Sequence, residues 1–132
     1  MRIATWIQPV AVFVAAQAAL AYPTGTRTTS VIPPGVRYDW TIRPVAGRYA
    51  SYGTKFDAVH RVARGQLGVR WKWGTSKDRG DSTFDCSNFT AYVFRHALAY
   101  KFTTSSRGQR DYVGWPVPKS GKRAGDLLSS LS

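Results

Sequence analysis

Apolar side chains recur at three- and four-residue steps after Cys86, which is the only cysteine in the chain. The positions are Phe89, Tyr92, Val93, Ala97 and Tyr100. This spacing puts them on one face of a helix, so the segment predicts a buried helix with Cys86 in its first turn. Amide dipoles at a helix N-terminus favour an anion. We therefore expect a thiol more acidic than a free cysteine, suited to act as a nucleophile.

An earlier segment predicts a second helix. Thr54 followed three residues later by Asp57 resembles a capping box, and Gly68 ends the pattern. The apolar face consists of Val59, Ala63 and Leu67. His60 lies inside this helix, and we interpret it as a solvated or partly packed side chain rather than a catalytic one.

Strand signals are short. The clearest is the alternation from Val36 to Ile42, which Pro44 ends. Because two helices and a few short strands do not follow a regular strand–helix–strand order, the sequence predicts an α+β fold.

The charge of the chain is strongly positive. Its 132 residues contain 19 Lys and Arg against 7 Asp and Glu, a formal net charge of +12. The partners that fit are anionic polymers: nucleic acid, a membrane surface or a cell-wall polymer. With 43% hydrophobic and 14% aromatic residues, the composition indicates a packed domain rather than a disordered chain.

The first 21 residues predict a secretory signal. Arg2 gives a positive start, an apolar run extends from Val10 to Leu20, and Ala19-Leu20-Ala21 has the form of a cleavage site. Residues 22–55, rich in Thr, Pro, Gly and Arg, predict a basic linker. In a secreted protein a lone cysteine cannot form an internal disulfide, so it is either inert and buried or reactive.

Two tryptophans alternate with basic residues before the cysteine, in Arg70-Trp71-Lys72-Trp73. They could form a stacking platform for nucleic-acid bases. They could also belong to a strand whose aromatic face covers a core, and we favour this second interpretation. No metal site or cofactor is predicted, because one cysteine and two histidines lack ligand spacing.

Several short elements together resemble the NlpC/P60 family of cysteine peptidases, over residues 56–128. The matching elements are Leu67-Gly68, Trp73-Gly74, Phe84-Asp85-Cys86-Ser87 with Phe89, and Ala124-Gly125-Asp126-Leu127. The resemblance implies a papain-like α+β fold that cuts peptide stems of bacterial peptidoglycan. It also implies that Cys86 is the nucleophile, that Asp85 and Ser87 support its turn, and that Trp71 and Trp73 line a substrate cleft.

The chain also departs from the family pattern. Trp71 stands where the family usually has tyrosine, Asn88 replaces a glycine, and Ala124 replaces a proline. The family's general base is a histidine after the Gly-Asp-Leu strand, and no histidine follows His96 here. We therefore expect residues 56–132 to be a peptidase domain truncated at its C-terminus, with residues 126–131 forming a strand that lacks neighbours.

Three functional interpretations remain open from the sequence. The favoured one is a secreted or wall-associated cysteine peptidase-like protein that lacks the histidine on which the family's activity depends. The alternative is a non-catalytic basic protein that binds anionic cell-wall polymer. Binding to nucleic acid is the least favoured, because a basic charge alone is usually solvated surface.

Overall fold

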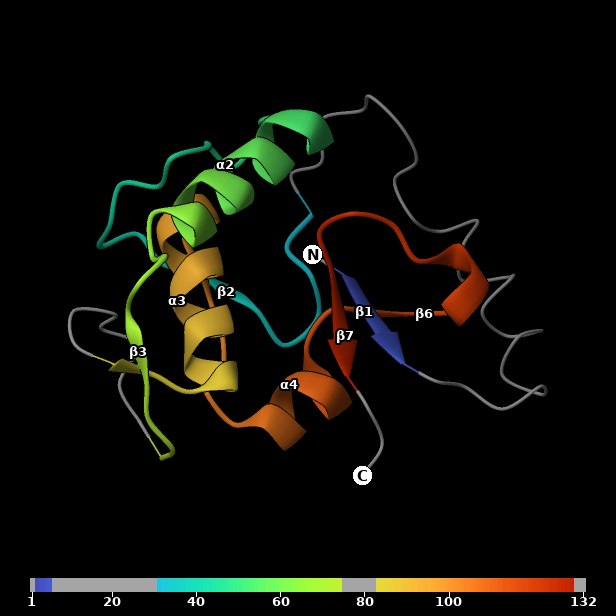
Figure 1. Cartoon of the computed structure of the whole chain (residues 1–132). Coiled ribbons are helices and arrows are strands. Elements are labelled where there is room, and N and C mark those ends of the chain that lie inside the picture. The colour runs from blue at the N-terminus through green and yellow to red at the C-terminus, as the bar shows by residue number, and fades with distance from the viewer. Residues whose placement is uncertain (1, 6–30, 75–82, 130–132) are drawn as a thin grey trace.

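Helices and short strands are mixed along the chain (Figure 1). The computed structural model describes residues 2–5, 31–74 and 83–129. The helices are α2 (Tyr52–Arg64), α3 (Cys86–Leu98) and α4 (Ser106–Tyr112), with a 3-10 turn η1 at Lys119–Gly121. The strands are β1 (Arg2–Thr5), β2 (Arg37–Tyr38), β3 (Arg70–Trp71), β4 (Thr83–Phe84), β5 (Tyr100–Lys101), β6 (Trp115–Val117) and β7 (Asp126–Ser129). The predicted α+β class is confirmed.

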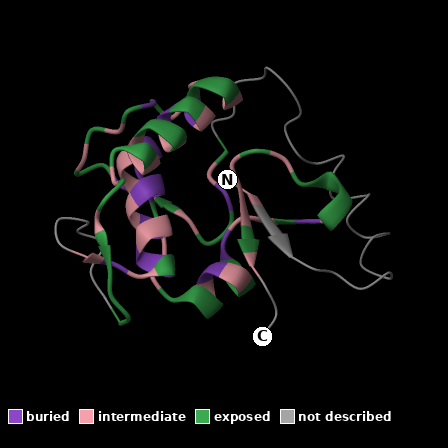
Figure 2. Ribbon diagram, in the orientation of Figure 1, coloured by how far each residue is buried: buried purple, intermediate pink, exposed green. Residues whose placement is uncertain are grey.

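The core lies where α2 and α3 pack against each other (Figures 1 and 2). Its buried side chains are Ala46, Ala58, Phe94, Ala97, Leu98 and Tyr100. Alanines on both helices let the two backbones approach closely, and the larger side chains fill the space on either side. The apolar face predicted for the segment after Cys86 is therefore the face that α3 buries.

Helix α3 ends at Leu98, and Ala99 is its C-cap. Ala99 adopts a left-handed conformation with φ 59°, and its N–H donates to the carbonyl of Arg95 at 2.8 Å. A residue in this conformation stops the helix, so Tyr100 starts strand β5 instead of continuing the helical face. The predicted helix is confirmed except for Tyr100, which lies in β5.

Helix α2 begins and ends earlier than predicted. The cap is Ser51, whose hydroxyl accepts from the backbone N–H of Thr54 at 3.2 Å. The helix stops at Gly65, where the chain enters a series of turns. Leu67 is consequently outside the helix and 79% exposed, so its assignment to the apolar face was wrong.

Much of the predicted linker is packed onto the C-terminal end of α3. Asp39 is buried, and its carboxylate accepts from the Arg95 Nε at 2.8 Å. The backbone N–H of Asp39 donates to the carbonyl of Ala99, and that of Ala46 donates to Ala97. Residues 31–51 are therefore part of the folded domain, unlike a spacer, because long-range hydrogen bonds and a buried ion pair hold them. Residues 22–30 lie outside the described ranges.

Strands β6, β1 and β7 form a sheet in that order, with β1 parallel to both neighbours. Strand β7 thus has the neighbour that we expected it to lack. An ion pair between Arg2 Nε and Asp126 Oδ1 at 3.4 Å joins β1 to β7. Strand β1 belongs to the segment predicted as a secretory signal, and most of that segment lies outside the described residues, so the signal stays a prediction.

Candidate active site

Cys86 is the first residue of α3, and its side chain is exposed and not part of a disulfide. Its backbone carbonyl accepts a hydrogen bond from Thr90 Oγ1 at 3.0 Å. Its sulfur has no hydrogen-bond partner among the residues that the structure describes. A thiol in this position can be reached from solvent and lies at the positive end of the helix dipole.

The turn that carries Cys86 is fixed by a capping box. Asp85 accepts from the backbone N–H of Asn88 at 2.8 Å, and the Asn88 side-chain oxygen accepts from the backbone N–H of Asp85 at 2.6 Å. Asn88 is fully buried. Asn88, which stands where the family usually has glycine, therefore has a local structural role, because its side chain supplies half of the capping box.

Ser87 is held from two sides. Its hydroxyl donates to Asp85 Oδ1 at 3.3 Å, and its backbone carbonyl accepts from Gln109 Nε2 at 2.7 Å. The same Gln109 nitrogen donates to the carbonyl of Thr103 at 2.9 Å. Gln109 lies in α4 and is buried. It therefore ties α4 and the preceding loop to the first turn of α3.

Trp71 lies on strand β3 beside the cysteine turn, and Trp73 lies in the turn that follows this strand. Strand β3 pairs in parallel with β4, so that Trp71 is opposite Phe84, two residues before Cys86. The two indole rings have centroids 6.4 Å apart, and they are 66% and 79% exposed. The interpretation that they cover a core was wrong. An exposed aromatic pair near an exposed thiol is a surface on which a ligand could lie.

The charges around this surface are basic. Arg70 and Lys72, which alternate with the tryptophans, are both exposed. Asp85 is the acidic residue of the cysteine turn, and its carboxylate is used by the capping box. In the described ranges no group of His, Cys, Asp and Glu side chains could hold a metal ion. The arrangement favours an anionic ligand over a cationic one.

Neither histidine is placed beside the thiol. His96 lies on the same helix ten residues further on, which is about 15 Å along the axis. Its ring contacts Tyr92, with centroids 4.2 Å apart. His60 is exposed and stacks on Phe56, with centroids 6.1 Å apart. A general base must come within about 3 Å of the proton that it removes, so His96 cannot serve Cys86 in this conformation.

Residues 68–130 match the model of the NlpC/P60 family, a range that contains Cys86, both tryptophans and β7. A protein of Listeria grayi, "Probable endopeptidase p60", is 34% identical over 79 residues. These residues are 59% of this chain but only 14% of the relative's length. No solved structure matches the chain. No helix in the described part is long and apolar enough to cross a membrane.

Proposed function

From the membership of this chain in the NlpC/P60 family, we propose that it is a secreted or wall-associated cysteine peptidase-like protein. Its substrate would be the peptide stems of bacterial peptidoglycan, and Cys86 would be the nucleophile. The observation that carries the proposal is the position of Cys86, exposed at the start of α3 on a turn fixed by the capping box. The name of the Listeria relative, an endopeptidase, supports the same reaction class.

The proposed reaction is nucleophilic acyl transfer. The thiolate of Cys86 attacks the carbonyl carbon of a stem peptide bond, a carbon–sulfur bond forms, and the amine leaves after taking a proton. Water then cleaves the thioester, which releases the carboxylate and restores the thiol. The backbone N–H of Cys86, in the first turn, is free of intrahelical bonds and available to the developing oxyanion.

The proton transfers determine how fast this reaction can run. His96 is too far from the sulfur, and His60 is engaged with Phe56. With no histidine beside the thiol, protons would have to move through solvent. General acid–base catalysis contributes about 10²- to 10⁴-fold. We therefore expect slow turnover from this chain, well below that of a cysteine peptidase with a positioned histidine.

The test of cleavage is the release of new amino termini from purified peptidoglycan. The wild-type chain should release them, and the Cys86→Ala chain should not. Because Cys86 is exposed, the substitution should leave the thermal unfolding temperature almost unchanged, which serves as the folding control. Equal release by the two proteins would contradict the proposal.

A second candidate function is supported by the exposed tryptophans and the basic residues that flank them. In this case the chain binds anionic wall polymer and does not cut it. Pelleting with insoluble wall would then survive Cys86→Ala, weaken as salt rises, and occur without amino-terminal release. If the chain instead pelleted equally at low and high salt, charge would not be the basis of the binding.

A further inference from the structure

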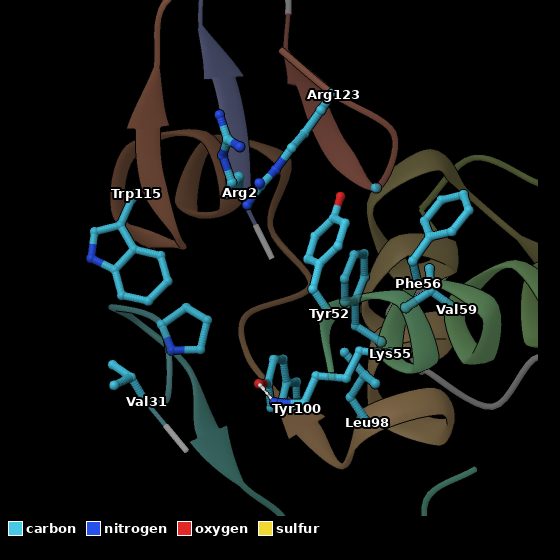
Figure 3. A pocket seen from close by; sticks show the side chains of 13 residues that line it. Arg2, Val31, Tyr52, Lys55, Phe56, Val59, Leu98, Tyr100, Trp115 and Arg123 are labelled. Carbon is cyan, nitrogen blue, oxygen red and sulfur yellow. Dashed lines mark hydrogen bonds between the residues drawn. The ribbon is translucent and has the colours of Figure 1, made fainter. Parts of the chain in front are cut away.

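A cavity of about 60 Å³ lies between helix α2, the end of α3 and the β6-β1-β7 sheet (Figure 3). Aromatic and aliphatic side chains, including Phe56 and Phe94, form its walls. Phe94 is eight residues after Cys86, so the cavity lies about 12 Å along the axis of α3 from the cysteine. Cys86 is not among the residues that line it. The cavity is therefore separate from the candidate active site.

Three cationic side chains line this cavity. Arg2 comes from β1, Lys55 from α2 and Arg123 from the loop before β7. In Figure 3 the two arginines enter from the side of the sheet, whereas Lys55 lies on the opposite side next to Tyr100. Of the described residues that line the cavity, none is Asp or Glu. An apolar space with this excess of positive charge is suited to an anion.

Lys55 is unusual because it is a lysine with only 8% of its surface exposed. Its Nζ lies 3.4 Å from the hydroxyl of Tyr100 and 5.9 Å from the centroid of that ring. Burial, and secondly the nearby Arg48, lower the pKa of Lys55. The ammonium group is thus less stable here than on a lysine in water, and a bound anion would stabilise it.

The two arginines differ in the groups that their guanidinium contacts. Arg2 forms the ion pair with Asp126 and donates to the carbonyl of Gly121 at 2.9 Å. The guanidinium carbon of Arg123 lies 4.4 Å from the centroid of the Tyr52 ring. The Nε of Arg123 is buried and has no hydrogen-bond partner among the described residues. A buried donor of this kind indicates where an acceptor oxygen would be stabilised.

From this arrangement we propose that the cavity binds a short aliphatic carboxylate. The carboxylate oxygens accept from Lys55 and Arg123, and the aliphatic part contacts Phe56 and Phe94. The size of the cavity limits the ligand, because an apolar cavity that accepts benzene has about 150 Å³. A volume of about 60 Å³ fits a carboxylate of two to four carbons and is too small for an aromatic acid.

The test is a titration of the full chain with sodium propanoate, followed by NMR of the backbone amides. The sodium chloride concentration is lowered by the same amount as sodium propanoate is raised, so that ionic strength stays constant. We expect saturable shifts at Lys55, Phe56 and Arg123 and none at Cys86. Propanamide has a similar size but no charge, and it should produce no saturable shift. Equal shifts with propanamide, or saturable shifts at Cys86 instead, would overturn the proposal.

A substitution isolates the contribution of charge. Lys55→Met keeps an unbranched side chain but removes the ammonium group, and it should weaken propanoate binding by about tenfold or more. Lys122→Met is the matched control, because Lys122 is exposed, lies outside the cavity and has the same charge. It should bind as the wild type does. Equal affinity of the Lys55→Met and Lys122→Met chains would contradict the assignment.

Arg123→Gln provides an independent test if Lys55→Met does not fold. Glutamine removes the guanidinium but keeps a polar side chain, and the same loss of about tenfold is expected. Circular dichroism establishes that each variant is folded before titration. Wild-type affinity in a folded Arg123→Gln chain would show that the buried Nε does not contact the ligand, and would overturn the proposed binding mode.

Discussion

The two ends of helix α3 are built in different ways. At its C-terminal end, Ala97 and Ala99 are fully buried, and residues 31–51 contribute hydrogen bonds and the ion pair of Asp39. At its N-terminal end, Cys86 is exposed, and its turn is held by the capping box and by Gln109. Contacts distant in sequence thus anchor one end of the helix. The other end presents the thiol on a turn that the local capping box and one hydrogen bond from Gln109 hold.

This difference separates stability from chemistry along one helix. The buried end can hold α3 in place, so the exposed end does not need to be covered by other elements. A thiol on a fixed helix terminus keeps both its orientation and its access to solvent. Substitutions should consequently affect unfolding most at the buried end and substrate handling most at the exposed end.

Phe94→Ala should have the largest effect on stability. Phe94 is buried in the core and lies near Phe102, with ring centroids 6.0 Å apart. Removing a buried phenyl group lowers the free energy of unfolding by about 3–5 kcal/mol. Phe89 lies at the other end of α3 and is only partly buried, so Phe89→Ala should lower the free energy of unfolding by clearly less. Urea unfolding of both variants measures the comparison, and equal losses would remove the distinction between the two ends.

The ion pair at the buried end should make the protein sensitive to acid. Hydrogen bonds from Thr41, and then from Arg95, hold the pKa of Asp39 well below its usual value of 3.8. A folded pKa below the unfolded one contributes stability above about pH 4, and this contribution is lost as pH falls towards the folded pKa. The unfolding temperature should therefore fall between about pH 5 and 2.

Asp39→Asn is the control for this acid effect. It removes the titrating group but keeps a side chain of the same shape. The variant should be less stable than the wild type at pH 7, and the difference between the two should shrink as pH falls. Parallel unfolding curves for the two proteins over this range would mean that another carboxylate is responsible.

Asp85→Ala should have a smaller effect on stability, centred on the cysteine turn. Loss of an N-cap costs about 1 kcal/mol, and here it also leaves Ser87 without its partner. Peptidoglycan cleavage should fall as well, because the first turn of α3 would fray. Ser105→Ala is the matched control, since Ser105 caps α4. Ser105→Ala should lower the free energy of unfolding by a similar amount but reduce peptidoglycan cleavage less than Asp85→Ala does.

Trp71→Ala should change stability least, by about 0.5 kcal/mol or less, because the side chain is exposed. Its effect should instead appear as weaker pelleting with insoluble cell wall. Trp40→Ala provides a control of the same residue type, since Trp40 is exposed in the segment that packs on the buried end of α3. If both substitutions weakened pelleting equally, the tryptophan surface beside Cys86 would have no special role.

The sequence predicted the parts of the fold that depend on local pattern. The helix after Cys86 was recognised from its apolar spacing, and the α+β class from short strands between helices. The bounds of α2 were missed because Ser51 and Gly65 compete with other plausible caps nearby. Residues 31–51 were predicted to be a linker because the hydrogen bonds that fix their structure are made to α3 and the residue after it, which lie far away in the sequence.

The candidate site shows the same limit. Cys86, Asp85 and Ser87 were proposed from the resemblance, since they are contiguous in the sequence. The exposure of Trp71 could not be derived, because alternating aromatic residues suit both a core and a surface. The bond from Gln109 to Ser87 and the cations around the cavity join residues far apart in the chain. Lys55 in particular reads from the sequence as an ordinary charged helix residue.

The most direct test of the role of Cys86 is intact-protein mass spectrometry after acid quenching of a reaction with peptidoglycan fragments. Nucleophilic catalysis passes through a thioester, so the wild-type chain should gain the mass of the acyl part of a stem peptide, located at Cys86 by digestion. The Cys86→Ala chain should gain no mass. Amino-terminal release by the wild type with no adduct, matched by equal release from Cys86→Ala, would contradict the assignment of Cys86 as the nucleophile.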